Sequence, residues 1–509
     1  MCDRALPPDR ACLRGARRLR RRNGGQAVPP RPGGPRCLLR RRPRTEPRGT
    51  SPALSVPPGR LSALHEADSR PCRHPPCLRA TFRRSPVFWW VDHRPGETRS
   101  VVYDTFDDIP DWWGTPLLAR PPSTAPWARS GRTVTYGQLR RQVTELRRLF
   151  QSHGIRAGAT VALRGVPSFS QLWAVFSLWS LGAQVHLMSS ETGGPELAAL
   201  LDRTRPQFYI AFGSSGLGGR HFHDECEIFV RRLRDGLPAA DDHALVQFTS
   251  ASTGAAKAVG RSVRSLLTEL DTFVRIGGMP RHGDRVLIVG PLTHSFPLIG
   301  GLLHNMNVGA ETVLPRSSSV PSLLRSAIRS DADTLLGSSE QFAQLARCAR
   351  PLAIRGLRRA IAGGARLNAF VHTAFEERHG VRIGQAYGTT ETGIIAADPT
   401  GWFGPDTAGM IAPGVHVRLL SGELQVRLDR SPYVGVQSAA PGFLRGEDGA
   451  GWLRTGDLVA FDPDNGGLRI TGRTDPLLPP RPPTREPDHV LLAPRTAGRA
   501  LTRAGKPVT

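Results

Sequence analysis

A run of hydroxyl-bearing and glycine residues that ends in a lysine is the stretch of this sequence best suited to binding a phosphate group. It follows the apolar residues 244–246 and Phe248, and its candidate ligands are Thr249, Ser250, Ser252, Thr253, Gly254 and Lys257. Small residues let the backbone approach a bound group, their N–H and O–H groups donate to phosphate oxygens, and the lysine adds a mobile positive charge. The run therefore predicts a phosphate-binding loop after a strand.

The spacing of this loop excludes the Walker motif. That motif needs a glycine directly before the lysine and a hydroxyl directly after it, whereas Lys257 stands between two alanines. A Ser/Thr-rich surface turn is the alternative interpretation, since these residues favour turns in any context. Lys257 is one of only two lysines in the sequence, the other being Lys506. A chain that rarely uses lysine has one where the loop interpretation needs it.

A second polar stretch, Gln-Ala-Tyr-Gly-Thr-Thr-Glu-Thr-Gly, occupies residues 385–393. Tyr387 offers a stacking face for a base, Gly388 lets the chain turn, and Thr390 offers a hydroxyl to phosphate. Glu391 supplies a carboxylate for Mg²⁺, which prefers oxygen ligands. By composition alone this stretch is compatible with any turn.

Taken together, these stretches resemble motifs of the acyl-adenylate-forming superfamily, which contains acyl-CoA synthetases, the adenylation domains of nonribosomal peptide synthetases, and luciferases. Residues 249–258 are similar to the family's T-S-G-T-T-G-x-P-K-G, with alanine at 251, 256 and 258. Residues 387–391 match its Y-G-x-T-E. Residues 291–294 resemble P-L-x-H, and residues 363–365 resemble G-G-A.

The resemblance implies a role for each matching residue. His294, by default a structural histidine, lies at the acyl pocket and its gate, and Gly363, Gly364 and Ala365 line the adenine and substrate pocket. Asp457, expected in a tight turn, accepts the ribose hydroxyls, and Arg473 contacts the ribose or a phosphate. Asp475 is the hinge for a small C-terminal domain. The implied catalytic residues are Lys257, Thr390, Glu391 and His294.

The reaction implied is attack of a carboxylate on ATP, giving acyl-AMP and pyrophosphate, followed by thioester formation. The implied cofactors are ATP, Mg²⁺ on Glu391, and coenzyme A or the phosphopantetheine of an acyl carrier protein. Residues 291–301 lack the aspartate with which amino-acid-activating members pair an α-ammonium group. An aliphatic or aromatic acid is therefore the expected substrate. The rival interpretation is a non-catalytic nucleotide-binding remnant or pseudoenzyme.

The elements that must position these residues follow from hydrophobic spacing. A short strand and turn at 133–139 leads into a helix whose apolar face holds Leu139, Val143, Leu146, Leu149 and Phe150. Strands at 160–163 and 184–188 flank a helix through Phe169, Leu172, Phe176 and Trp179, and 286–289 is a further buried strand. Such alternation predicts a mostly parallel sheet covered on both faces.

The expected fold is α/β: a large adenylate-forming N-terminal domain of mostly parallel sheets flanked by helices, plus a small β-rich subdomain. The expected domains are an Arg/Pro-rich, disordered extension (1–95), the AMP-binding domain (96–471), and a hinge with a remnant of the C-terminal lid (472–509). Residues 494–499 faintly resemble the family's P-R-T-x-x-G-K but lack its catalytic lysine. Loss of such a charge costs on the order of 10²–10³ in rate, so weak adenylation is expected.

The net charge of +25 is concentrated at the ends of the chain. Residues 1–100 hold 23 arginines against 7 acidic residues, and the surplus between residues 101 and 471 is only +5. We therefore expect no nucleic-acid binding by the body. For the basic extension three interpretations stay open: a tail for an anionic partner, a solvated segment without function, or a start codon placed too early.

The sequence also bears on compartment. It has no run of 18 apolar residues, and no apolar stretch follows the N-terminal arginines, so neither a membrane span nor a signal peptide is expected. The seven cysteines show no disulfide or zinc framework, and the pair at 72 and 77 lacks a second pair. The expected location is cytoplasmic.

Overall fold

The computed structural model describes residues 112–213, 221–249, 256–348, 354–434, 442–447 and 449–474, all within one compact unit, His74–Thr509. Several predictions lie outside the described residues: the 1–95 extension, the cysteine pair, the hinge and the 476–509 tail. The same holds for loop residues Ser250, Ser252, Thr253 and Gly254. These stay predictions. No helix in the described part of the chain is long and apolar enough to span a membrane.

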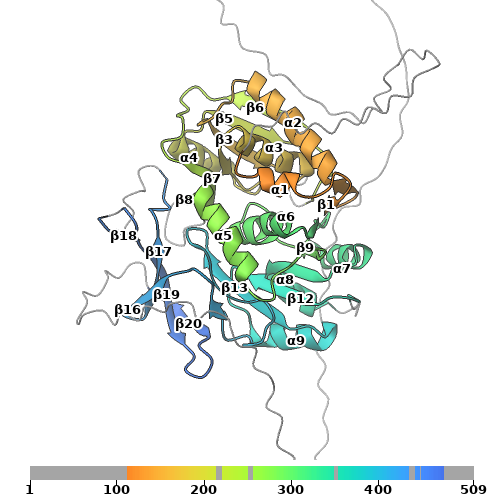
Figure 1. Cartoon of the computed structure of the whole chain (residues 1–509), viewed down its shortest axis with the longest axis vertical. Helices are drawn as coiled ribbons and strands as arrows, with labels where there is room; N and C mark the ends of the chain where they lie inside the picture. The colour runs from red at the N-terminus through yellow and green to blue at the C-terminus, as the bar shows by residue number, and fades with distance from the viewer. Residues whose placement is uncertain are drawn as a thin grey trace, which may run out of the picture. The chain divides into compact units, whose positions relative to one another are not determined.

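A six-stranded sheet contains the predicted strands at 160–163 and 184–188 (Figure 1). Its order is β6 (Ile228–Arg232), β5 (Phe208–Phe212), β3 (Thr160–Gly165), β4 (Gln184–Leu187), β7 (His243–Thr249), β8 (Lys257–Ser262). The four inner strands run parallel, while β6 and β8 pair antiparallel at the edges. The α/β prediction is confirmed here.

The helices beside this sheet begin and pack as their sequences dictate. Helix α2 (Tyr136–Ser152) starts with a capping box, because Thr135 accepts from the Gln138 N–H and Gln138 accepts from the Thr135 N–H. Every residue of α3 (Phe169–Ser180) is buried, as expected for a helix that is apolar on all sides. Helix α4 (Gly194–Thr204) begins with a proline in its first turn.

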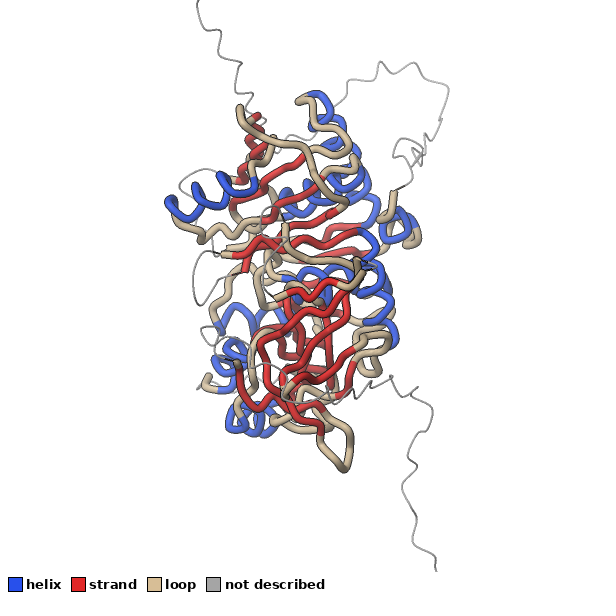
Figure 2. The backbone as a smooth tube through the Cα atoms, turned by 90° about the vertical axis from the view of Figure 1, so that its left-hand side faces the viewer, coloured by secondary structure: helices blue, strands red, loops and turns tan. Residues whose placement is uncertain are grey.

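The second sheet has nine strands, and Figure 2 shows strands of the molecule with helices beside them. Its order is β15 (Met410–Ile411), β14 (Gly393–Asp398), β13 (Ile383–Thr389), β12 (Arg359–Gly363), β11 (Thr334–Ser338), β9 (Arg285–Ile288), β10 (Glu311–Val313), β1 (Pro126–Arg129), β2 (Thr133–Thr135). Pairing is parallel from β13 to β1 and antiparallel at both edges.

The remaining described helices precede or follow strands of this sheet or join the two sheets. They are α1 (Thr115–Ala119), α5 (Val263–Arg275), the π-helix η2 (Phe296–Leu303), α6 (His304–Val308), α7 (Val320–Arg329), α8 (Ser339–Ala346) and α9 (Ala369–His379). One core cluster contains residues of both sheets, including Leu163 of β3, Phe273 of α5 and Ile288 of β9. The two sheets therefore share a hydrophobic core.

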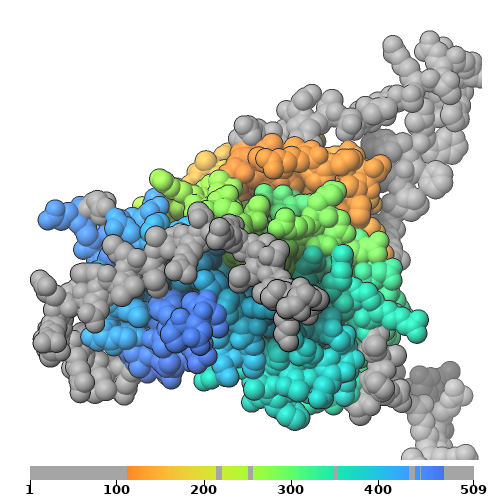
Figure 3. Space-filling view, turned by 60° about the horizontal axis from the view of Figure 1, so that its bottom comes forward, coloured from red at the N-terminus to blue at the C-terminus, as the bar shows by residue number. Residues whose placement is uncertain are grey.

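The predicted β-rich subdomain is a five-stranded sheet, confirmed with order β16 (Val417–Leu420), β17 (Glu423–Leu428), β19 (Gly451–Phe461), β18 (Phe443–Arg445), and with β20 (Leu468–Arg473) paired to β19. Leu424 and Val426 of β17 are buried and belong to the hydrophobic core of this sheet. In the space-filling view, the light-green segment of β8 and α5 borders the blue strands of this sheet (Figure 3). An isolated bridge joins Val259 of β8 to Tyr433 at this border.

Candidate active site

The β7–β8 hairpin carries the lysine of the predicted phosphate loop. Thr249 ends β7 and pairs with Lys257, the first residue of β8, so the predicted loop connects two adjacent strand ends. The Lys257 side chain is exposed. Its Nζ atom lies 5.4 Å from the centroid of the Tyr433 ring, within cation–π range. The ammonium group thus lies over an aromatic face at the start of β8.

Tyr433 is a residue of this site that the sequence reasoning missed. It is 5% exposed, and burial together with the Glu391 carboxylate raises the pKa of its hydroxyl to about 12. Tyr433 therefore lies within electrostatic reach of Glu391 and beneath Lys257. Its sequence context, Ser-Pro-Tyr-Val-Gly, contains no motif, and only the bridge to Val259 places it here.

The β13–β14 hairpin carries the second polar stretch. Tyr387 and Gly388 lie in β13, and Thr390 and Glu391 lie in the turn before β14. Thr389 and Thr392 close this turn, because the Thr392 hydroxyl accepts from the Thr389 N–H and the Thr389 hydroxyl accepts from the Thr392 N–H. A side chain on Gly388 would meet the Gly393 carbonyl oxygen at 2.2 Å, so the hairpin needs a glycine there.

Two residues predicted to contact the nucleotide, Tyr387 and Arg473, meet at the carboxylate of a third, Asp457. The Tyr387 hydroxyl donates to Asp457 Oδ2 at 2.6 Å, and Arg473 Nε lies 3.0 Å from Asp457 Oδ1. Asp457 and Arg473 are register partners on β19 and β20. Burial raises the pKa of Tyr387 well above its ordinary value, and the Asp457 carboxylate raises it further. The phenol therefore stays protonated and donates to Asp457.

The expectation of a tight turn at Asp457 is wrong. Asp457 lies inside the continuous strand β19, and it is 7% exposed. The preceding Gly456 has φ of +75°, and the register between β19 and β20 shifts after Leu458. The glycine therefore serves a local irregularity of the strand and not a turn. Pairing with β20 keeps residues 457–461 extended.

Replacing Tyr387 by phenylalanine is expected to lower the free energy of unfolding by about 1.5–3 kcal/mol at pH 7, since a hydrogen bond to a buried carboxylate is lost. The difference in free energy of unfolding between the wild-type chain and the variant should shrink as pH rises above about 10. There the unfolded tyrosine ionises and the folded one stays protonated, so the wild-type chain loses stability that the phenylalanine variant keeps. Urea unfolding at pH 7, 9 and 11 measures both effects.

Tyr136→Phe is the matched control for that measurement. Tyr136 is buried, whereas Tyr387 is half-buried, and burial raises the pKa of both hydroxyls. Within the described residues the Tyr136 hydroxyl has no hydrogen-bond partner. Its removal should leave stability at pH 7 unchanged or slightly raised. A Tyr387→Phe variant as stable as Tyr136→Phe at pH 7 would contradict the role of the Asp457 hydrogen bond.

The predicted gate histidine, His294, lies in a turn just before the π-helix η2. His294 closes a turn onto the Pro291 carbonyl oxygen, at 3.1 Å from its N–H, two residues before η2. Desolvation by the surrounding chain lowers the pKa of His294, and the Glu191 carboxylate partly offsets this. Buried Gln247 of β7 fixes the turn, donating to the Thr293 carbonyl oxygen at 2.7 Å and accepting from the Ser295 hydroxyl at 2.6 Å. The turn is thereby tied to the strand that precedes the predicted loop.

The glycine pair at the end of β12 has two structural reasons. A Cβ atom on Gly363 would lie 2.5 Å from the Phe296 ring, and Gly364 has φ of +86°. The Gly363 backbone therefore packs directly against the Phe296 ring at the start of η2. The Ala365 carbonyl oxygen accepts from the Ser339 hydroxyl at 2.7 Å, which anchors the turn to α8.

Glu391 is the predicted magnesium ligand. Within the described ranges no group of three or more His, Cys, Asp and Glu side chains could hold a metal ion by itself. Mg²⁺ commonly takes one or two carboxylates and fills its remaining positions with water and substrate phosphates. A single carboxylate on a hairpin turn, within electrostatic reach of Tyr433, is therefore compatible with Mg²⁺.

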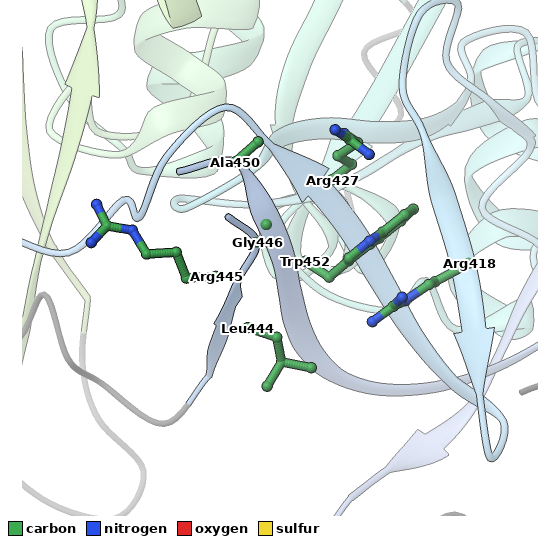
Figure 4. A pocket seen from close by; sticks show the side chains of 8 residues that line it. Arg418, Arg427, Leu444, Arg445, Gly446, Ala450 and Trp452 are labelled. Carbon is green, nitrogen blue, oxygen red and sulfur yellow. The ribbon is translucent and has the colours of Figure 1, made fainter. Parts of the chain in front are cut away.

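The described residues also line a cavity of about 270 Å³ on the five-stranded sheet (Figure 4). It is lined by Arg418, Arg427, Leu444, Arg445, Gly446, Ala450, Gly451 and Trp452. The guanidinium carbon of Arg418 lies 4.3 Å from the centroid of the Trp452 ring. No predicted site residue lines this cavity, so it is separate from the candidate site.

Comparison with known proteins gives the family. A model of the AMP-binding enzyme family matches residues 118–431. The chain is 26% identical over 266 residues to 4-coumarate--CoA ligase-like 4 of Oryza sativa, covering 47% of this chain and 46% of that protein. It is 28% identical over 249 residues to anthranilate--CoA ligase of Pseudomonas aeruginosa, covering 46% and 47%. The chain thus spans about half the length of these curated relatives.

The fold agrees with a solved structure of the same kind. The crystal structure of the anthranilate CoA ligase AuaEII in complex with anthranoyl-AMP superposes with a TM-score of 0.62 at 19% identity. The match covers 72% of this chain and 79% of that one. Since the family model spans more than half of the sequence, this chain belongs to the AMP-binding enzyme family.

Proposed function

We propose that the chain activates a carboxylic acid as an acyl-adenylate and transfers the acyl group to a thiol. In the first step a carboxylate oxygen attacks the α-phosphorus of ATP, the bond to the bridging oxygen breaks, and pyrophosphate leaves. In the second step the thiol sulfur attacks the acyl carbon, AMP leaves with the bonding electrons, and the thiol proton is released. The observation that carries the proposal is the Tyr387–Asp457–Arg473 cluster in a chain of this family.

The geometry supports a division of the site into a nucleoside end and a phosphate end. The Asp457 cluster forms the nucleoside end, where the carboxylate accepts from ribose hydroxyls and the Tyr387 ring faces the base. Lys257, the 249–254 run and Thr390 form the phosphate end. Tyr387 and Glu391 are four residues apart, so at most about 14 Å separates the ends along the backbone. One nucleoside triphosphate is long enough to bridge them.

At the phosphate end Glu391 would hold Mg²⁺, which would neutralise charge on the pyrophosphate leaving group. The protein's own contribution is a fixed positive charge. Lys257 is held over Tyr433, so it needs little reorganisation when negative charge develops on the phosphates. Binding the acid next to the nucleotide, in the orientation needed for attack, would supply the rest of the rate acceleration.

For the acid, we propose an aliphatic or aromatic carboxylate, received near His294. The absence of an aspartate in 291–301 and the names of the relatives, which act on anthranilate or are named for 4-coumarate, support this choice. We propose coenzyme A or carrier-protein phosphopantetheine as the thiol. We also propose that residues 96–471 form the adenylating domain.

Pyrophosphate release from ATP tests the proposal. Anthranilate, 4-coumarate, benzoate and octanoate should each be assayed with Mg²⁺, beside phenylalanine and a control without acid. We expect release that depends on at least one aromatic or aliphatic acid and not on the amino acid. Nucleotide binding without release under any acid would support the non-catalytic alternative, and absence of nucleotide binding would contradict both.

A further inference from the structure

A buried ion pair lies between the two halves of the candidate site. Arg261 of β8 and Glu269 of α5 are 3% and 8% exposed. Arg261 Nη2 lies 2.7 Å from Glu269 Oε2, and Arg261 Nε donates to the Ser265 hydroxyl at 3.2 Å. A buried charge is tolerated only when it is paired, so the pair holds both side chains in one geometry.

The second oxygen of the Glu269 carboxylate binds the hairpin that carries Glu391. Glu269 Oε1 accepts from the Ile394 N–H at 2.9 Å. At the neighbouring Gly393, whose φ is +71°, a Cβ atom would lie 2.5 Å from the Glu269 carboxyl carbon. The carboxylate is therefore seated directly on the backbone that follows the Glu391 turn.

The pair links two different sheets. Arg261 follows Lys257 by four residues on the same strand of the six-stranded sheet, while Ile394 follows Glu391 by three residues in the nine-stranded sheet. A displacement of either strand end would stretch the Arg261–Glu269–Ile394 connection. The connection therefore limits the separation between the predicted phosphate cation and the predicted magnesium ligand.

We propose that Arg261 and Glu269 are positioning residues that set the distance between Lys257 and Glu391. The consequence for nucleotide binding rests on the proposed function, whereas the consequence for the hairpin backbone does not. The rival explanation is general stabilisation of the core. An apolar pair of similar size would serve that purpose equally well, because replacing a buried ion pair as a whole is often neutral or stabilising.

The double variant Arg261→Leu/Glu269→Leu separates these explanations. It keeps the site filled but removes the acceptor for the Ile394 N–H. The matched control is Arg129→Leu/Glu311→Leu, which replaces another ion pair, with Nε–Oε1 of 2.8 Å, at the β1–β10 end of the nine-stranded sheet. Amide exchange across 387–396 in the full chain, and the affinities for Mg²⁺–ATP and for AMP, should be measured for both variants and the wild type.

We expect the Arg261/Glu269 double variant to exchange its Ile394 amide at least tenfold faster and to bind Mg²⁺–ATP 10–100-fold more weakly, the usual cost of losing a residue that orients a ligand. Affinity for AMP, which needs the Asp457 cluster, should change less than about threefold. The Arg129/Glu311 control should change none of the three. If the double variant does not fold, Glu269→Gln should show the same pattern, because its single amide oxygen cannot take the place of both carboxylate oxygens, one of which accepts from Arg261 and the other from the Ile394 N–H.

Unchanged exchange across 387–396 in these variants overturns the proposal, as does an equal loss of affinity for AMP and for Mg²⁺–ATP. If the wild-type chain binds neither nucleotide, the proposed function fails instead. The exchange measurement then decides the positioning role alone, faster exchange supporting it and unchanged exchange refuting it.

Discussion

Replacing Asp457 by asparagine is expected to weaken AMP binding about 100-fold. The carboxylate is 7% exposed and accepts from Tyr387 and Arg473, so it is held in one orientation. A hydrogen bond to a charged group contributes about 1.5–3 kcal/mol. Asparagine keeps only one, uncharged oxygen acceptor, so one bond to a ribose hydroxyl is lost and the other is weakened, about 3 kcal/mol in all. Every 1.4 kcal/mol is tenfold in affinity. Titration calorimetry with AMP measures the effect.

Asp462→Asn is the matched control for this prediction. Asp462 lies at the other end of the β19–β20 hairpin, is also 7% exposed, and is also paired with an arginine, Arg469. Its substitution should leave the AMP dissociation constant within about twofold of the wild-type value. Equal effects of the two substitutions would mean that the hairpin, and not the Asp457 cluster, governs nucleotide binding.

Replacing Lys257 by methionine is expected to slow pyrophosphate release by 10²–10³. The side chain keeps its length but loses the ammonium group held over Tyr433. Removing one preorganised charge or donor of this kind commonly costs that factor in rate. AMP affinity should be nearly unchanged, because AMP has no β- or γ-phosphate for the lysine to contact. Single-turnover release of pyrophosphate at saturating ATP measures the rate.

Arg264→Met provides the comparison, since Arg264 is a nearby cation on α5 whose side chain is 83% exposed. It should release pyrophosphate at the wild-type rate. The rarity of lysine offers a second readout, because Lys257 and Lys506 are the only lysines in the sequence. ATP should protect Lys257, and not Lys506, from an amine-reactive reagent. A Lys257→Met variant with the wild-type rate would remove the lysine from the mechanism.

Local patterns predicted much of the fold. The apolar spacing from Leu139 to Phe150 predicted α2, and the series Phe169, Leu172, Phe176 and Trp179 predicted α3. Strands β3, β4 and β9 were also predicted, because buried strands are short apolar runs with visible ends. These elements need only their own residues to be recognised.

The contacts that complete the site are not local. Tyr387 and Asp457 are 70 residues apart in sequence, and the packing of the nine-stranded sheet against the five-stranded sheet brings their side chains within hydrogen-bonding distance. Tyr433 and Glu269 have no motif of their own, so sequence reasoning passed over both. The tight turn expected at Asp457 is wrong because a glycine next to an aspartate occurs in an irregular strand as well as in a turn.

A crystal structure of the chain with a non-hydrolysable acyl-AMP analogue tests the central claim most directly. The account predicts a ribose hydroxyl within about 3.2 Å of the Asp457 carboxylate. It also predicts the phosphate mimic on the side of Lys257 and Glu391. A nucleotide bound elsewhere, for example in the arginine-lined cavity beside Trp452, would contradict it.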